Sequence, residues 1–275
     1  MDRPCPVLVI VVFVCYLACA VWLASSAYRA GSDSAHGQRV AGMSLGATAL
    51  VLHATVLWQA WDTRPDTAFT LAETASVIGW LVGAIALGLT WRRPRFAGVS
   101  AILLTVASIV AALTDEGARS FAVGRYSWEI TAHIALSITA YALLTVAAAL
   151  AIALARLDHR LRKRQPLRWL GTLPSVEALD AGMFQAVGAG FALLTLALFS
   201  GFVFVDNLFA QHLIHKTVLS CLAWVVFALL LLGRWRFGWR GRTAVRWVLS
   251  GFALLVLAYF GAKLVLESIL GRHWG

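Results

Sequence analysis

Long apolar stretches separated by short polar segments run through the whole chain. A bilayer core is crossed by roughly 20 apolar residues in a helix, which satisfies its own backbone hydrogen bonds in lipid. No segment alternates apolar and polar residues as a strand does. The pattern predicts an all-α, polytopic transmembrane helical bundle, a single integral membrane domain over residues 1–275, with spans at approximately 6–27, 40–61, 69–91, 96–114, 128–157, 182–205, 213–233 and 244–269.

The composition supports this interpretation. Hydrophobic residues make up 60% of the chain and charged residues 13%, whereas a soluble domain typically has about 25% charged residues. The formal net charge of +10 would suggest nucleic-acid binding in a soluble protein. Here the cations lie between apolar runs, so we expect them to orient the chain in the lipid bilayer and expect no nucleic-acid partner.

The cations occupy alternate connections between the predicted spans. Cytoplasmic loops of membrane proteins carry an excess of Lys and Arg, so this set of connections is predicted to be cytoplasmic. Eight spans then place both termini outside, in a bacterial inner membrane. The basic connections hold Arg29, Arg39, Arg92, Arg93, Arg95, Arg156, Arg160, Arg162, Lys163, Arg164, Arg168, Arg234, Arg236, Arg240, Arg242 and Arg246.

Ionisable side chains inside a membrane are rare and are candidates for function. In the predicted topology, all those within or next to a span fall in the outer half of the membrane or at its outer edge. His36 and His159 fall instead in the basic loops, where we expect them to be solvated. The outer set is His53, Glu73, Glu129, His133, His212, His215, Lys216, Lys263, Glu267 and His273.

Helical spacing singles out one of these histidines. His133, Ser137 and Tyr141 recur at every fourth residue and form a polar stripe on an otherwise apolar helix. Such a stripe usually faces the interior of the bundle, and His133 is either a ligand there or a packing residue. The same choice is open for His53, a ligand or a hydrogen-bonded structural histidine, and His212 is either a ligand or a solvated loop residue.

The chemistry of this set favours haem over other cargoes. Zinc requires compact thiolate or carboxylate support, and a proton relay requires histidine and carboxylate chains, which Glu73 and Glu129 could join. Haem needs only one or two axial imidazoles, an apolar slot with aromatic residues and cations for its propionates. No nucleophile–base pair, phosphate-binding loop or metal-hydrolase motif is visible, so we do not expect an enzyme.

The order of several motifs resembles a known family. His215 begins a stretch that runs through Trp224 into an apolar helix, followed by Gly238-Trp239-Arg240-Gly241-Arg242, Gly251-Phe252 and Tyr259-Phe260-Gly261. The order resembles the cytochrome c assembly (CcsA/CcmC-type) haem-handling membrane proteins, most of all their YpjD-type inner-membrane branch. Other matching elements are the His133–Ser137 segment, the Leu173–Glu177 segment, Gly201 and His53. The resemblance extends from about residue 40 to the end.

The resemblance implies an inner-membrane haem-binding or haem-handling protein linked to cytochrome c biogenesis. It implies haem b held on the periplasmic side, with His133 and His215 as iron ligands. His212 or His273 are the alternatives to His215, and His53 marks a second position deeper in the membrane. Lys216, Arg125 or Lys263 would pair with the propionates, and the implied partners are other cytochrome c maturation proteins or an apocytochrome.

One loop departs from the family pattern. Haem-presenting members carry a tryptophan-rich segment before the seventh span, whereas residues 205–214 contain no tryptophan. Transfer of haem to an apocytochrome is therefore less firmly implied than haem contact. Three alternatives stay open: a small-solute or ion transporter, which would explain Glu73, His53 and Lys263; a haem-bearing electron-transfer subunit; and a membrane scaffold that has lost haem binding.

Overall fold

The computed structural model describes residues 6–29, 33–63, 71–112, 127–163, 174–204 and 214–261. Within these ranges the ordered elements are all helical, and eight helices are long and apolar enough to cross a membrane. The predicted all-α, multi-pass architecture is thus confirmed. The elements are α1 (Pro6–Tyr28), α2 (Asp33–Thr63), α3 (Leu71–Arg92), η1 (Pro94–Phe96), α4 (Ala97–Ala112), α5 (Trp128–Arg162), α6 (Val176–Phe204), α7 (Ile214–Phe237), α8 (Gly241–Val256) and the π turn η2 (Leu257–Gly261).

Several helices are longer than the predicted spans. The helix α2 begins at Asp33 rather than at residue 40, α5 continues to Arg162, and α6 begins at Val176. An apolar run marks only the residues in the hydrocarbon, whereas a helix continues through the polar interface because its backbone hydrogen bonds continue there. His36 and His159, which were expected in loops, therefore lie on helix ends, where both are exposed.

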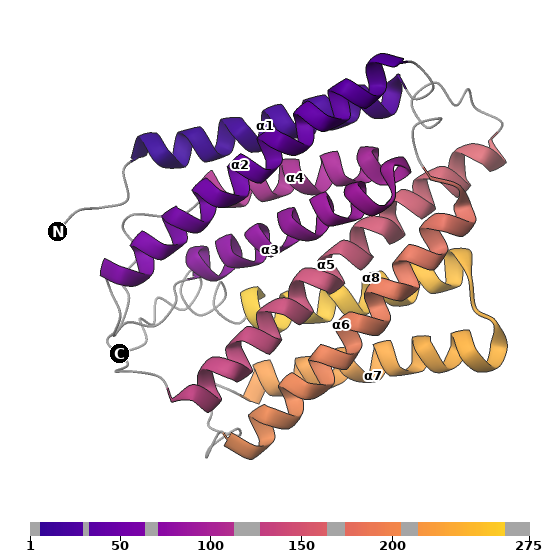
Figure 1. The fold of residues 1–275 in the computed structure, drawn as a ribbon. Helices are drawn as coiled ribbons and strands as arrows, with labels where there is room; N and C mark the ends of the chain where they lie inside the picture. Colours follow the sequence, from indigo (N-terminus) through magenta and orange to yellow (C-terminus); the bar gives the residue numbers. More distant parts are fainter. Residues whose placement is uncertain are drawn as a thin grey trace. The chain divides into compact units, whose positions relative to one another are not determined.

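The helices pack as two compact units, which are treated separately. Unit 1 is drawn from residues 1–125 and 157–178, and unit 2 from residues 126–156 and 179–275. In unit 1, α1 packs against α2 and α4, and α3 packs against α2 and α4 (Figure 1). In unit 2, α7 packs along α8 and its π turn.

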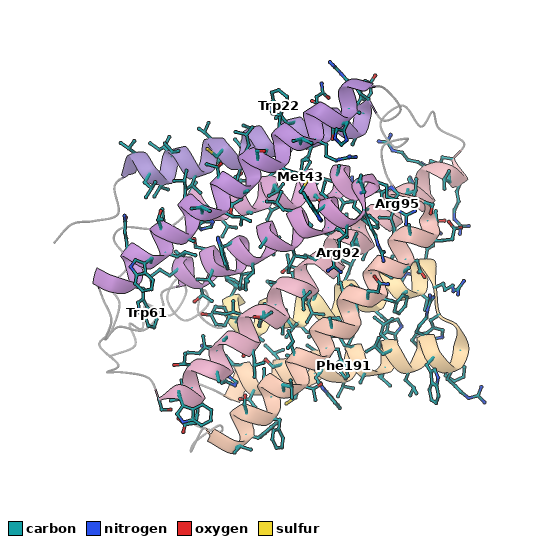
Figure 2. All side chains as sticks on the ribbon, in the orientation of Figure 1. Trp22, Met43, Trp61, Arg92, Arg95 and Phe191 are labelled. Atoms are coloured by element: carbon teal, nitrogen blue, oxygen red, sulfur yellow. The ribbon has the colours of Figure 1, made fainter. Side chains whose placement is uncertain are left out.

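The cations of unit 1 gather at one end of its helices. Because α1, α2 and α3 run in alternate directions, the end of α1, the start of α2 and the end of α3 meet. Arg92 and Arg95 lie at this end, while Trp61 lies at the far end of α2 (Figure 2). The described helices of unit 1 are therefore arranged as the predicted alternation requires, and the assignment of this end to the cytoplasm stays a prediction.

Aromatic and small residues join the helices of unit 2. The Phe191 ring of α6, labelled in Figure 2, stacks on Trp224 of α7 with ring centroids 5.5 Å apart. The Trp224 indole also donates a 2.9 Å hydrogen bond to the Thr195 hydroxyl. On α8, Gly251 faces the buried Phe227 ring of α7 so closely that a Cβ there would lie 2.8 Å from the ring.

Replacing Gly251 by alanine is expected to destabilise unit 2. The new methyl group meets a ring with no exposed surface, and overpacking of this kind costs about 1–3 kcal/mol. The gain in helix propensity is at most about 1 kcal/mol. Gly188→Ala on α6 is the matched control, because nothing lies within 4 Å of its Cβ position. Unfolding in mixed micelles should be easier for Gly251→Ala alone; equal stability of the two variants would contradict the close contact.

A buried carboxylate holds the turn between α7 and α8. Asp180 of α6 is 7% exposed; its Oδ2 lies 3.1 Å from Nη1 of Arg234, and its Oδ1 accepts the Gly241 backbone N–H at 3.3 Å. Arg234 also donates to the Trp239 carbonyl at 3.0 Å. The residue before α8, Arg240, provides no side-chain cap. Asp180 of α6 thus has two roles: it caps the start of α8, and it fixes the turn between α7 and α8 through Arg234.

Candidate functional site

His133 reaches from α5 to α6 at the end of unit 2 opposite the α7–α8 turn (Figure 1). Its Nδ1 lies 3.0 Å from the Ser200 hydroxyl, which in turn donates its proton to the Ala197 carbonyl at 2.9 Å. The serine oxygen therefore accepts a hydrogen bond from the ring, which places the imidazole proton on Nδ1. The Nε2 atom of the neutral ring keeps its lone pair.

A glycine allows this ring to lie against α6. A Cβ on Gly201 would lie 3.1 Å from Cε1 of His133 and 3.5 Å from Nδ1, so a larger residue would push the imidazole away. The half-buried ring is held on its Nδ1 side by Ser200, and Gly201 lies closest to its Cε1 atom. Within the described part of the chain, the ring forms its hydrogen bond through Nδ1 with Ser200, and the Ala197 backbone of α6 also interacts with the ring. Metal-ligating histidines are commonly oriented in this way, with the second ring nitrogen held by an outer partner.

A second polar group lies further along α5. The Tyr141 hydroxyl donates a 2.8 Å hydrogen bond to the Leu255 carbonyl, at the point where α8 changes into its π turn. The Tyr141 ring meets Tyr259 edge-on at 6.1 Å, and the Lys216 ammonium lies 5.5 Å from the centre of the Tyr259 ring. Tyr259 of the π turn thus connects Lys216 of α7 with the polar stripe of α5, through a cation–π contact on one side and a ring contact on the other. Turns of π-helix are frequent at functional sites.

His53 lies in the core of unit 1 and is 1% exposed. Its Nδ1 is 3.2 Å from the Tyr16 hydroxyl, and its Nε2 is 2.9 Å from the Ser76 hydroxyl, so one histidine links α1, α2 and α3. Both ring nitrogens are used, and a ligand role would require one of these bonds to break. The contacts match the structural alternative for this residue, and its role in cofactor binding stays a prediction.

The remaining candidates are only partly visible. His215 lies in the first turn of α7, but its side chain is outside the described residues, as are His212, His273, Lys263, Glu267 and Arg125. Glu73 and Glu129 are placed in the first turns of α3 and α5. A carboxylate there is stabilised by the positive end of the helix dipole, which explains both residues without a transport pathway.

The described metal-ligating side chains suit haem iron better than zinc. Among the described residues, no group of three or more His, Cys, Asp or Glu side chains converges as a metal cluster. Zinc sites generally require three or four such ligands, whereas haem iron accepts a single imidazole on one face. His133 offers one imidazole nitrogen next to apolar helices, which fits an axial haem ligand.

Two residues of this site carry no signal of their own in the sequence. Ser200 and Gly201 look like small packing residues near the end of an apolar span, and Ser200 lies 67 residues from His133. The signal that could have found them is a polar residue followed by a small one in a span, at the same membrane depth as a histidine in another span. Such a pairing becomes meaningful once α5 and α6 are known to be neighbours.

Comparison with known proteins identifies relatives of the chain. A family model described as "Cytochrome C assembly protein" matches residues 94–270, more than half of the chain. The inner membrane protein YpjD of Escherichia coli K12 is 39% identical over 137 residues, which are 50% of this chain and 52% of that protein. An uncharacterized 28.8 kDa protein of Azospirillum brasilense is 31% identical over 213 residues, 77% of this chain and 78% of that protein.

A more distant relative has a named role. The cytochrome c biogenesis protein CcsA of Microcystis aeruginosa is 29% identical over 104 residues, 37% of this chain and 32% of that protein. The match to YpjD covers about half the length of that relative. No solved structure matches the chain.

Proposed function

Because the chain belongs to the cytochrome c assembly protein family, as its motifs predicted, we propose that it binds and handles haem b with His133 as an iron ligand. The family name and the name of the CcsA relative link such proteins to cytochrome c biogenesis. The described residues include eight helices that are long and apolar enough to cross a membrane, as expected of a multi-pass membrane protein. The proposed role is to hold haem and pass it to a maturation partner or an apocytochrome, without covalent chemistry by this chain, which is therefore no enzyme.

The observation that supports the proposal is the orientation of His133. Ser200 accepts the Nδ1 proton, and the Nε2 lone pair is left for a metal. Haem supplies an iron that takes neutral imidazole nitrogen as an axial ligand. Since protonated imidazole cannot ligate, acidification is expected to weaken binding.

The other contacts would come from α7 and the segments next to it. His215 is the proposed second iron ligand, with His212 and His273 as the alternatives, and His53 marks a second position along an entry path. Lys216, next to Tyr259, is the proposed partner of a propionate, because an ammonium and a carboxylate form a strong charge-assisted hydrogen bond.

We further propose a side of the membrane for this site, on the basis of the distribution of cations. His133 and Lys216 lie near the starts of α5 and α7, at the end of unit 2 opposite Arg234 (Figure 1). Basic ends face the cytoplasm, so the proposed haem end is periplasmic in a bacterial inner membrane.

A visible spectrum tests the function. The protein is produced in cells with ample haem, purified in mild detergent and examined by its Soret band and by a pyridine haemochrome assay for haem b. Near-stoichiometric haem b supports the proposal. A folded, monodisperse protein that stays colourless after haem is added back contradicts it and favours the transporter or scaffold alternatives.

Removing the Ser200 hydroxyl is expected to weaken haem binding without abolishing it. In Ser200→Ala the His133 ring loses the acceptor that fixes its tautomer, and loss of such outer partners typically lowers metal affinity about 10–100-fold. Ser200→Thr keeps the hydroxyl and is the rescue variant. Haem titration followed at the Soret band gives the affinities; equal affinity of the alanine variant and the wild type would argue against an ordering role for Ser200.

A further inference from the structure

The turn between α7 and α8 is held more firmly than a simple connection requires. Asp180 binds both Arg234 and the start of α8, and the Trp239 ring stacks on Trp247 with centroids 5.4 Å apart. Gly238 and Gly241 have φ values of +66° and +58°, a conformation that favours glycine. The side chains that this turn carries are therefore presented in a fixed arrangement.

Three exposed arginines lie next to this turn and are here called the basic platform: Arg236, Arg240 and Arg246. The described residues of unit 2 contain two carboxylates. Glu129 lies in the first turn of α5, at the other end of the unit, and Asp180 is already bonded to Arg234 and Gly241. Neither Arg240 nor Arg246 forms a hydrogen bond or ion pair with a described residue. The platform thus presents positive charge that unit 2 leaves available to a ligand.

Large apolar side chains lie directly beside these cations. Trp235 is 84% exposed and Phe237 is 70% exposed, and the Arg236 guanidinium lies 5.9 Å from the Phe237 ring centre. The apolar stretches of α7 and α8 end at Phe237 and begin at Gly241, so the platform lies where two spans leave the hydrocarbon. Aromatic rings at that depth sit among lipid headgroups, next to the acyl chains.

We propose that the basic platform binds the phosphate groups of an anionic phospholipid in the adjacent leaflet. A guanidinium group binds a phosphate through two parallel hydrogen bonds, and Arg240 directly precedes α8 while Arg246 lies in its second turn. The exposed Trp235 and Phe237 can pack against the acyl chain of a phospholipid. A soluble phosphate has no acyl chain and cannot make this contact. In the predicted topology this is the cytoplasmic leaflet, whose anionic lipids attract basic surfaces of proteins.

Lipid retention in the purified full-length protein tests this proposal. Wild-type protein in detergent is mixed with cardiolipin or with zwitterionic phosphatidylcholine, and bound lipid is counted by native mass spectrometry. The platform variant is Arg240→Gln with Arg246→Gln, and the matched control is Arg160→Gln with Lys163→Gln, two exposed cations at the end of α5, whose last turn contains no Trp, Tyr or Phe. At about a five-fold contribution from each cation, we expect cardiolipin binding about twenty-five-fold weaker in the platform variant and a clearly smaller loss in the control, whose cations have no such aromatic neighbour in their helix turn.

Two further measurements separate the outcomes. Arg240→Lys with Arg246→Lys keeps the charge but loses the paired hydrogen bonds, so its cardiolipin binding should fall between those of the wild type and the glutamine variant. Wild-type retention by the glutamine variant would overturn the proposal and leave the platform to a soluble acidic partner. Equal retention of phosphatidylcholine, or displacement of cardiolipin by millimolar sodium phosphate, would overturn it as well.

Discussion

Replacing His133 by alanine is expected to remove almost all bound haem. The variant loses the one nitrogen that Ser200 and Gly201 orient towards a metal, so the effect should exceed the roughly 10–100-fold cost of losing an outer partner. Haem content per protein is measured by the Soret absorbance and the pyridine haemochrome. His133 also contributes a hydrogen bond to Ser200, so the helical content of the variant is measured in parallel.

His159→Ala is the matched control for this prediction. His159 lies on the same helix but is exposed in its last turn, and its replacement should leave the haem content unchanged. His53→Ala separates the two roles considered for that residue. Since Tyr16 and Ser76 both bond its ring, a stability loss with haem retained indicates a structural role. Wild-type haem content in folded His133→Ala would be inconsistent with the proposed ligand.

Replacing Asp180 by alanine is expected to cause a large loss of stability. The change leaves Arg234 without its carboxylate and the start of α8 without its cap, and breaking a buried pair from one side costs about 3–5 kcal/mol. The free energy of unfolding is measured by titrating dodecyl sulfate into mixed micelles. We expect the midpoint to fall well below that of the wild type.

Two further variants test the cause of that loss. Glu177→Ala removes an exposed carboxylate from the first turn of α6, the helix that carries Asp180, so at most about 1 kcal/mol of favourable helix-dipole energy should be lost. Replacing Asp180 and Arg234 together by leucine removes both charges and should restore part of the stability. If Asp180→Ala unfolds no more readily than Glu177→Ala, the buried pair does not hold the turn.

The helices could be predicted well from the sequence because a bilayer restricts the backbone structures that can cross it. An apolar run of sufficient length must be helical in lipid, and the alternation of arginines between runs shows which helix ends meet. The ends of α2, α5 and α6 were less well predicted, since interfacial turns such as Asp33–Arg39 combine polar composition with helical backbone. Polar composition alone does not distinguish such a turn from a loop.

The site was predictable only in part, for a different physical reason. His133 could be selected because an ionisable residue inside a span needs an explanation. Its partner Ser200 could not, because the contact depends on how α5 and α6 pack, and serine is common in membrane helices. Asp180 was also missed. A carboxylate at a basic helix end looks like an ordinary interfacial charge until its contacts with Arg234 and Gly241 are known.

A ligand exchange at His133 tests the central claim most directly. Methionine is similar in length to histidine and its thioether sulfur is also an axial haem ligand, so His133→Met should retain some haem with altered ligation. Near-infrared magnetic circular dichroism of the ferric protein distinguishes histidine from thioether ligation. The account predicts histidine ligation in the wild type and a thioether signature in His133→Met. An unchanged histidine spectrum in a haem-loaded His133→Met protein would contradict it, because the iron would then be bound by other residues.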